Sequence, residues 1–503
     1  MISMLNSPLL NPLTFQEELG AVVVTETTPT TRRFDIKLKN ERTLVRRGEV
    51  IEVPSNSGEI LIGMVREIQK MNPYFTSALS SGNYSETDQI QTLFPVEEWA
   101  STFAAVDSLG VFNGSQISRV QFPADPGNKV FRARQDILTV LYGLSSPTTG
   151  IHLGEIVNTN TPLRIDLTKL VRKHFAILAI SGAGKSYTVT VLLEEIMKRS
   201  PLIGRLPVII IDPHGEYTSL ADYKEFQSEC KVYSSRDFSI PISSINAWQL
   251  REFSPDITHV QVRELERIIL DLKSSNRLKN FSDILLEAEI SQRLSSRTRD
   301  SILGWLEGLN RFDLYGPNEN PSVKELIRPG RISVLDMSDV HSLRKKQIMT
   351  AYLARRAFEL RRDHLGSPFL LVIEEAHQFC PEQETAISRP IIETIAREGR
   401  KFFASLCLVS QRPVRLSGTA LSQCNTHIIM RIRNPYDLDY ISRLSEGIDK
   451  DTLKILPELE VGEAIVTGEA VRYPVLTRIR STVVSGGKFQ HSLEEELSEF
   501  EDY

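Results

Sequence analysis

Residues 175–186 read FAILAISGAGKS: an apolar run, then small residues, a lysine and a serine. The apolar run predicts a buried strand, and the segment Tyr187–Met197 behind it predicts a helix. Small residues let backbone N–H groups turn toward phosphate oxygens, while the helix N-terminus adds its positive dipole. This pattern is typical of a phosphate-binding loop, although Ala179 stands where the usual first glycine would be.

The side chains of this loop predict its ligands. Lys185 would reach the β- and γ-phosphates of a nucleotide, and the Ser186 hydroxyl would coordinate Mg²⁺. ATP and Mg²⁺ are therefore the expected cofactors. The residues expected to bind the nucleotide here are Ser181, Gly182, Ala183, Gly184, Lys185, Ser186 and Tyr187.

Beyond about residue 165, short and mostly apolar runs alternate with helix-length segments. Runs buried on both faces and joined by helices are typical of a parallel α/β sheet. The runs are Ala176–Ile180, Val208–Ile211, Ile332–Leu335, Phe369–Ile373, Leu406–Val409 and His427–Ile432. In the gap of about 120 residues between the second and third runs, a charge-rich helical pattern over Trp248–Leu309 predicts an inserted helical subdomain.

The residues before this core predict a small β-barrel, because short β-like runs alternate with turn-rich pieces such as TTPTT and PSNSG. These runs are Ala21–Val24, Phe34–Leu38, Val50–Val53, Ile60–Val65, Val106–Phe112, Ile117–Phe122 and Ile137–Leu141. The segment LSSPTTG at 144–150 predicts a linker. The expected division is an arm (1–18), the barrel (19–148), the first part of the core (149–245), the helical insertion (246–325), the second part of the core (326–483) and a tail (484–503).

Polar residues follow two of the predicted strands. Glu374 could hold Mg²⁺ through water, and Glu375 could polarise the attacking water, as an ATP hydrolase requires. Gln411, at the tip of the next strand, could sense the γ-phosphate or make a structural hydrogen bond. An acid placed to activate water favours an ATPase over a kinase.

Two further motifs each allow two interpretations. In DPHGEY, Asp212 and Glu216 could assist Mg²⁺ and the water, or simply cap the next helix. In AREGRK, Arg397 and Arg400 could act on the nucleotide of a neighbouring subunit as an arginine finger. The alternative for these arginines is a helix C-terminus carrying favourable cations.

Composition restricts the class of protein. The 503 residues carry 59 basic and 64 acidic side chains, a net charge of −5 that argues against a basic coat but permits a local basic channel. No apolar run approaches the ~18 residues of a membrane span, so we expect a cytoplasmic protein with no membrane partner. The four scattered cysteines predict reduced core residues. Residues 494–503 form an acidic tail that is solvated or binds a partner.

The motifs AISGAGKS, DPHGEY, VIEEAHQF, AREGRK and LVSQRP, in this order, resemble those of the HerA family of hexameric ATPases and DNA translocases. These are relatives of the FtsK-type motors in the ASCE class of P-loop ATPases. The resemblance implies an α/β fold: a RecA-like P-loop core with an N-terminal β-barrel, the HAS barrel of that family, and a helical insertion. It also implies Glu375 as the catalytic acid, Gln411 as the sensor and Arg400 as the finger acting in trans.

By the same resemblance, three residues outside the loop contact a nucleotide. Lys173 stands where the family has an arginine shortly before the phosphate loop. Arg472 and Tyr473 belong to a brace, formed by strands expected at 462–468 and 473–480, that reaches over a neighbouring subunit's nucleotide.

The resemblance further implies a homohexamer with double-stranded DNA in its central pore. A separate nuclease similar to NurA, or a defence effector such as a sirtuin-like NADase or a nuclease, would dock on the barrel. The context would be DNA end resection or anti-phage defence. Candidate basic segments for the pore are Arg344–Lys346 and the group Arg293, Arg297 and Arg299. The alternative is a hexameric ATPase that scaffolds or activates an effector without obligatory translocation.

Overall fold

The computed structural model describes residues 17–25, 27–39, 45–55, 58–71, 101–254, 257–292, 294–444, 448 and 450–484. The arm, the acidic tail beyond residue 484 and Arg293 therefore lie outside the described residues. The chain divides into a unit of residues 1–144 with 156–161 and a unit of residues 145–155 with 162–503. Each unit is described by itself.

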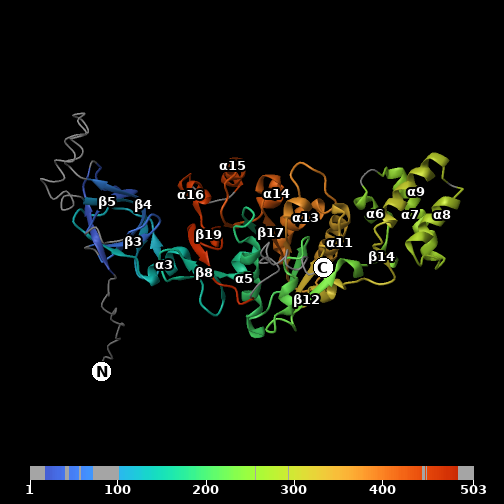
Figure 1. The fold of residues 1–503 in the computed structure, drawn as a ribbon, viewed down its shortest axis with the longest axis horizontal. Helices are drawn as coiled ribbons and strands as arrows, with labels where there is room; N and C mark the ends of the chain where they lie inside the picture. The colour runs from blue at the N-terminus through green and yellow to red at the C-terminus, as the bar shows by residue number, and fades with distance from the viewer. Residues whose placement is uncertain are drawn as a thin grey trace, which may run out of the picture. The chain divides into compact units, whose positions relative to one another are not determined.

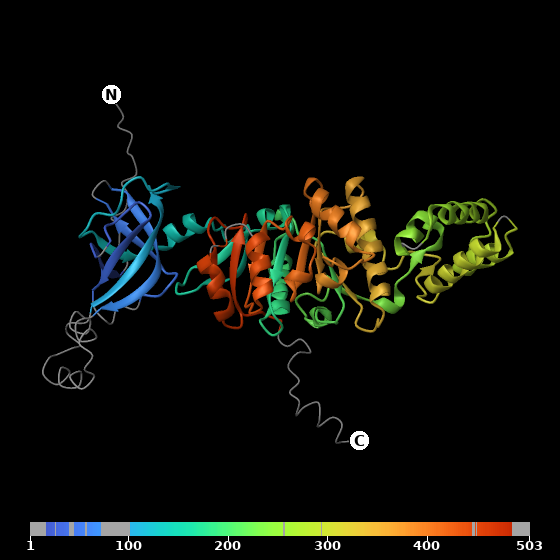
Figure 2. The ribbon, with the colours of Figure 1, turned by 90° about the horizontal axis from the view of Figure 1, so that it is seen from above.

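The first unit is an antiparallel barrel in the order β2-β1-β7-β3-β4-β5-β6, closed by a pairing of β2 with β5 (Figure 2). Buried and exposed residues alternate along the strands, so Phe34, Ile36 and Val106 point into one core. The strands are β1 (Glu18–Val23), β2 (Arg33–Leu38), β3 (Val50–Pro54), β4 (Ile60–Met71), β5 (Ser101–Phe112), β6 (Ile117–Ser118) and β7 (Lys129–Arg132).

The last run assigned to the barrel is a helix, so that prediction is wrong. Ile137–Leu141 lies inside α3 (Gln135–Tyr142), whose buried residues Ile137, Leu138, Leu141 and Tyr142 share one helical face. Gly143 ends the helix in the left-handed conformation, with φ of 67°. A five-residue apolar run is too short for its period to distinguish a strand from a helix.

The second unit is built on an 11-stranded sheet in the order β12-β15-β11-β16-β17-β10-β18-β19-β20-β8-β9. The seven strands from β12 to β18 in this order pair in parallel, and the others described pair antiparallel. The parallel strands are β10 (Phe175–Leu178), β11 (Val208–Asp212), β12 (Cys230–Ser234), β15 (Ile332–Asp336), β16 (Phe369–Ile373), β17 (Ala404–Ser410) and β18 (Thr426–Ile429). The antiparallel strands are β8 (Gly150–Ile156), β9 (Pro162–Asp166), β19 (Glu463–Gly468) and β20 (Val475–Ile479).

Helices join the parallel strands, as the alternating pattern predicts. They are α4 (Leu167–Arg172), α5 (Lys185–Met197), α10 (Val323–Leu326), α11 (Leu343–Arg362), α12 (Ala376–Phe379), α13 (Arg389–Glu398), α14 (Gly418–Leu421), α15 (Pro435–Leu444) and α16 (Lys450–Ile455) (Figure 1). The segment between β12 and β15 forms helices that pack on one another: α6 (Ala247–Phe253), α7 (His259–Ser274), α8 (Phe281–Ile290) and α9 (Ser296–Asn310). A short two-stranded sheet, β13 (Ile240–Pro241) with β14 (Tyr315–Gly316), lies at the base of this insertion.

The parallel sheet has two edges that carry different residues. At the carboxyl edge, the phosphate loop and the residues after β11, β16 and β17 come together. At the amino edge, Phe175 of β10 lies level with Thr426 of β18, which in turn pairs with Gly468 at the end of β19. The turn from β19 to β20 and the start of β10 therefore share the amino edge.

Within the described residues, the structure contains no helix that could cross a lipid bilayer. The four cysteines are buried and unbridged.

Candidate nucleotide site

The phosphate loop connects β10 to α5, which begins at Lys185. Gly182 and Gly184 have φ angles of 76° and 103°, a region that side chains with a Cβ rarely adopt. A Cβ on Gly184 would also lie 3.2 Å from Cε of Met430, the residue that follows β18. Ser181 and Gly182 are exposed, so the loop presents its backbone to a ligand at the N-terminus of α5.

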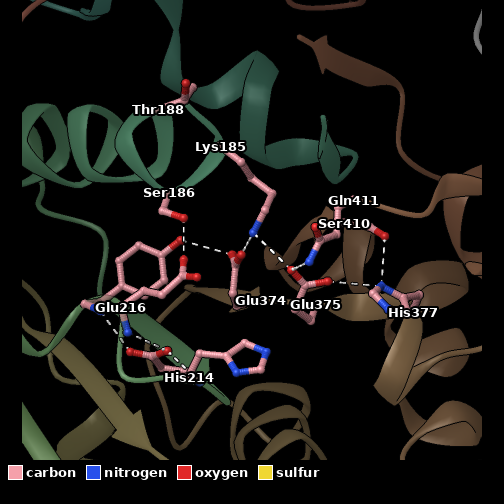
Figure 3. Close-up of polar contacts among 12 residues, drawn as sticks. Lys185, Ser186, Thr188, His214, Glu216, Glu374, Glu375, His377, Ser410 and Gln411 are labelled. Carbon is pink, nitrogen blue, oxygen red and sulfur yellow. Dashed lines mark hydrogen bonds and ion pairs between the residues drawn. The ribbon is translucent and has the colours of Figure 1, made fainter. Parts of the chain in front are cut away.

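Lys185 points from α5 toward the end of β16, where two carboxylates meet it (Figure 3). Its Nζ forms an ion pair with Glu374 and lies 3.3 Å from Oε1 of Glu375. The side chains of all three residues are at most 7% exposed. One buried ammonium facing two carboxylates can transfer its contact to the phosphates of a nucleotide, because phosphate oxygens offer it equally strong acceptors.

The backbone of Glu375 is strained, with φ of 50° and ψ of 45°. Its carboxylate is held on both sides: Nε2 of Gln411 donates to Oε1 over 2.6 Å, and Nδ1 of His377 lies 3.2 Å from Oε2. The same Nδ1 lies 3.2 Å from Oγ of Ser410, the last residue of β17. The strain and these contacts fix one carboxylate beside the phosphate loop, which is what a residue that orients a water requires.

The DPHGEY turn brings two more side chains to the loop. Ser186 Oγ donates to Glu216, and the Tyr217 hydroxyl donates to Oε2 of Glu374 over 3.0 Å. Tyr217 is fully buried, and burial raises the pKa of its hydroxyl well above the usual value. It is therefore a donor at every working pH, and it fixes the orientation of Glu374.

Asp212 organises this turn. Its Oδ1 accepts the backbone N–H groups of His214, Gly215 and Glu216 over 2.8–3.3 Å, and its Oδ2 accepts that of Tyr217 over 2.9 Å. Burial raises the pKa of Asp212 against the opposing effect of these donors. With both oxygens engaged by the backbone, the geometry favours the capping interpretation for Asp212, and Glu216 is the DPHGEY carboxylate that faces Ser186.

The donor set at the loop suits Mg²⁺. Mg²⁺ prefers oxygen ligands and in phosphate sites uses a hydroxyl, one or two carboxylates, water and the phosphates themselves. Ser186 supplies the hydroxyl. Glu216 supplies a carboxylate that contacts this hydroxyl directly, and Glu374 supplies a carboxylate that Tyr217 links to it. These are the residues that would hold the ion.

The remaining predicted residues lie at the amino edge, and the structure does not bring them to the phosphate loop of their own chain. Lys173, just before β10, forms an ion pair with Glu469 in the turn after β19. Arg472 and Tyr473 follow in the same turn. Arg397 and Arg400 precede β17: Arg397 lies 3.9 Å from Glu393 on its own helix, and Arg400 is exposed.

Tyr187 contacts the chain's own C-terminal segment. Its hydroxyl accepts the backbone N–H of Thr482 over 2.7 Å. Two turns further along α5, buried Glu194 accepts the N–H groups of Val483 and Val484 and pairs with Arg480. The first turn of the phosphate-loop helix is thus tied to residues 480–484, a link that no sequence motif predicts.

Two further site residues were missed or assigned otherwise from sequence. Tyr217 belongs to the DPHGEY motif, but the motif predicts roles only for Asp212 and Glu216, although a tyrosine following an acid at a strand tip was an available signal. His377, in the VIEEAHQF motif, contacts Glu375. Burial and the neighbouring Arg412, Arg415 and Lys185 lower its pKa, which Glu375 opposes.

The chain is similar to known proteins. A family model described as "Helicase HerA, central domain" matches residues 151–357. The DNA double-strand break repair helicase HerA of Pyrococcus furiosus is 30% identical over 526 aligned residues, covering 92% of each chain. Probable helicase MJECL08 of Methanocaldococcus jannaschii is 29% identical, over 87% of this chain and 91% of its own. The VirB4 structure of Thermoanaerobacter pseudethanolicus aligns with a TM-score of 0.53 over 68% of this chain and 98% of its own, at 16% identity, a likeness of fold.

Proposed function

The chain belongs to the HerA family of P-loop ATPases, and we propose that it hydrolyses ATP to translocate along double-stranded DNA. The observation that carries this proposal is the joining of Lys185, Glu375 and Gln411 in one buried, hydrogen-bonded group beside the phosphate loop. Hydrolysis of the γ-phosphate requires a carboxylate that activates water, and here a polar sensor at the tip of the neighbouring strand holds that carboxylate.

Each residue of this group has a separate task in hydrolysis. Lys185 releases the carboxylates and holds the β- and γ-phosphates, and this exchange frees Glu375 to accept a hydrogen bond from the attacking water. Gln411 donates to that carboxylate, and as the proposed sensor of the γ-phosphate it would change its hydrogen bonding when the phosphate is lost. Mg²⁺, held by Ser186 with Glu216 and Glu374, would neutralise charge on the phosphates.

A ring of subunits supplies the rest of the site in this proposal. Arg400, Arg472 and Lys173 lie at the edge of the sheet opposite their own phosphate loop, which supports a role at another chain's nucleotide. We assign Arg400 as the finger in trans, with Arg397, Arg472 and Tyr473 as additional contacts. A homohexamer closes such head-to-tail contacts into a ring around DNA.

The names of the relatives support the DNA substrate. The Pyrococcus furiosus protein is named as a DNA double-strand break repair helicase, and it aligns with nearly the whole of this chain. We propose the same class of work, with a separate nuclease or defence effector docked on the barrel unit. We propose end resection or anti-phage defence as the context of this pairing.

The test measures ATP hydrolysis with and without a long DNA duplex. We expect DNA to stimulate hydrolysis by wild-type protein, and Glu375→Gln to lower the rate by about 10²–10⁴-fold while leaving ATP binding intact. Absence of DNA stimulation, alone and with a co-purified partner, would contradict translocation. A Glu375→Gln protein that still assembles with the partner and supports its activity would favour the scaffold alternative instead.

A further inference from the structure

Two surface turns beside the sensor carry a cationic patch that the hydrolytic site does not use. β17 continues through Gln411 into a 3-10 turn, Pro413–Arg415, and β18 continues into α15. These turns bear the arginine patch, defined here as Arg412, Arg415, Arg433 and Tyr436. All four are exposed, and Tyr436 is 78% exposed.

The two turns are fixed to each other. The backbone N–H of Val414 donates to Oδ1 of Asp437 over 2.9 Å, and the Tyr440 hydroxyl donates to the carbonyl of Leu416 over 2.8 Å. Asp437 is only 4% exposed, so its carboxylate caps the turn and does not face the surface. The patch is therefore a preformed surface, which lowers the entropic cost of binding a ligand.

The arginines of the patch differ from their neighbours in their ion pairing. Across the described ranges of the chain, no carboxylate forms an ion pair with Arg412, Arg415 or Arg433. By contrast, Arg443 at the other end of α15 pairs with Asp439 over 2.5 Å. These guanidinium groups have no counterion among the described residues, and an exposed aromatic ring lies in the same patch. Such a surface suits a polyanion that carries planar bases. Arginine binds phosphate oxygens with paired donors, and the ring packs on sugar or base.

Three residues of the basic segments singled out from the sequence are engaged elsewhere. Lys346 is buried and donates to the carbonyl of Pro213 over 2.7 Å. Arg344 donates to the carbonyl of Phe253 over 2.9 Å, and Arg299 to that of Ser291 over 2.8 Å. These side chains hold loops in place, so they are not free to grip a polyanion.

The patch is also connected to the ATP site through one strand. The backbone N–H of Arg412 donates to Oγ of Ser410 over 3.1 Å, and the same Oγ contacts His377. Gln411, between them, contacts Glu375. A change at the γ-phosphate that moves Gln411 must therefore move the start of the patch.

We propose that the arginine patch grips the phosphate backbone of DNA and that Gln411 transmits the state of the nucleotide to it. The inference rests on the proposed function and names the surface that contacts the track. In a ring, each subunit would present its patch in turn, and sequence-independent phosphate contacts would let the grip move along the duplex.

The test compares Arg415→Ala/Arg433→Ala with a control, Arg267→Ala/Arg443→Ala, that removes the same charge from exposed sites of the same unit. Arg412 stays in place because it adjoins Gln411. Binding of a fluorescein-labelled DNA duplex is measured by anisotropy across a salt series. We expect the patch variant to raise Kd by about tenfold or more. The slope of log K against log salt should become shallower by about 0.9 for each phosphate that the variant no longer neutralises.

DNA-free ATP hydrolysis should stay within about twofold of wild type for both variants, which shows that the fold is intact, while DNA stimulation is lost only in the patch variant. Arg415→Lys/Arg433→Lys should recover most of the binding, because lysine still supplies a charge to phosphate. Equal loss in the control would overturn the proposal, and so would a patch variant that fails to assemble by mass photometry, since the patch would then be a contact between copies. Wild-type protein that does not bind DNA would refute the proposed function itself. Wild-type binding with an unaffected patch variant would refute this inference alone.

Discussion

The two edges of the parallel sheet carry charged residues in opposite circumstances. At the carboxyl edge, Lys185 and Glu375 are buried and bonded within their own chain. At the amino edge, Arg400 is exposed and Lys173 makes one partly exposed ion pair with Glu469. Buried charges must be paired inside their own chain, whereas exposed charges remain available to bind another surface. In the ring proposed above, this difference would let one chain prepare a site that a second chain completes.

The largest expected effect comes from mixing two inactive variants, which tests whether the two edges of the sheet belong to the sites of different chains. Lys185→Ala should abolish hydrolysis by removing the phosphate contact, and Arg400→Ala should lower it by about 10³-fold by removing the trans charge. If the edges belong to different sites, a mixed ring contains interfaces that pair an intact phosphate loop with an intact finger. Mixed before assembly, the two variants should therefore recover part of the wild-type rate, in a proportion set by the mixing ratio.

The control for this experiment is a mixture of Lys185→Ala with Glu375→Gln, two changes at the same edge. Because both damage the site that one chain prepares, this mixture should recover nothing. Recovery there, or none with Arg400→Ala, would contradict the division of the edges.

Acid should weaken a buried contact at the amino edge. His174 accepts the backbone N–H of Leu406 through Nδ1 over 3.0 Å and contacts the carbonyl of Ala396 through Nε2 over 3.0 Å, so it holds the end of α13 against β17. Burial lowers the pKa of His174 to about 4. As pH falls below about 6.5, the unfolded chain takes up a proton before the folded one, so stability is lost from that pH down to about 4.

The expected loss from His174 is about 3 kcal/mol across this window, with none above about pH 7. Urea unfolding at a series of pH values measures it. His174→Asn, which keeps a polar group and tolerates the local φ of 59°, should flatten the curve between pH 6.5 and 4. His427, whose pKa is also lowered to about 4 by burial, contributes to the slope that remains, together with His377 and His152, whose pKa values burial also lowers. An unchanged slope in the variant would show that the amino edge has no such sensitivity.

Removing one hydroxyl at the carboxyl edge should have a smaller effect. Tyr217→Phe leaves the packing but deletes the donor to Glu374, so the carboxylate loses its fixed orientation. We expect kcat to fall by about tenfold, the order of one hydrogen bond to a charged group, with an increased Mg²⁺ requirement. Steady-state kinetics at several Mg²⁺ concentrations tests this. Thr188→Ser, a change of a buried hydroxyl residue on α5 that bonds Gly184, is a matched control and should leave the Mg²⁺ dependence unchanged.

The sequence was sufficient for what depends on local pattern. The parallel strands and the phosphate loop were predictable because the apolar runs in Phe369–Ile373 and FAILAISGAGKS, and the glycines of the latter, determine the local backbone structure. Helix α3 was not predictable, because the short apolar run Ile137–Leu141 fits both the period of a helix and that of a strand. The contact of Tyr217 with Glu374 joins residues 157 positions apart, and the placement of Lys173 beside Glu469 depends on sheet order, which no local motif encodes.

The smallest expected effect concerns the ion pair of Lys173 with Glu469. Its test separates a local structural role of Lys173 from a role at a neighbouring subunit's nucleotide. Its side chains are 22% and 43% exposed, so solvent screens the pair and it should contribute at most about 1 kcal/mol to stability. A double-mutant cycle with Lys173→Ala and Glu469→Ala, followed by thermal unfolding, measures that contribution. If Lys173 instead serves a neighbouring subunit's nucleotide, Lys173→Ala lowers the ATPase rate of the assembled ring, while Glu469→Ala, which frees the lysine, leaves it unchanged or raises it. Equal losses of activity in the two variants would mean that the pair is only a local fastening of the β19–β20 turn, and the amino edge would then act through its arginines alone.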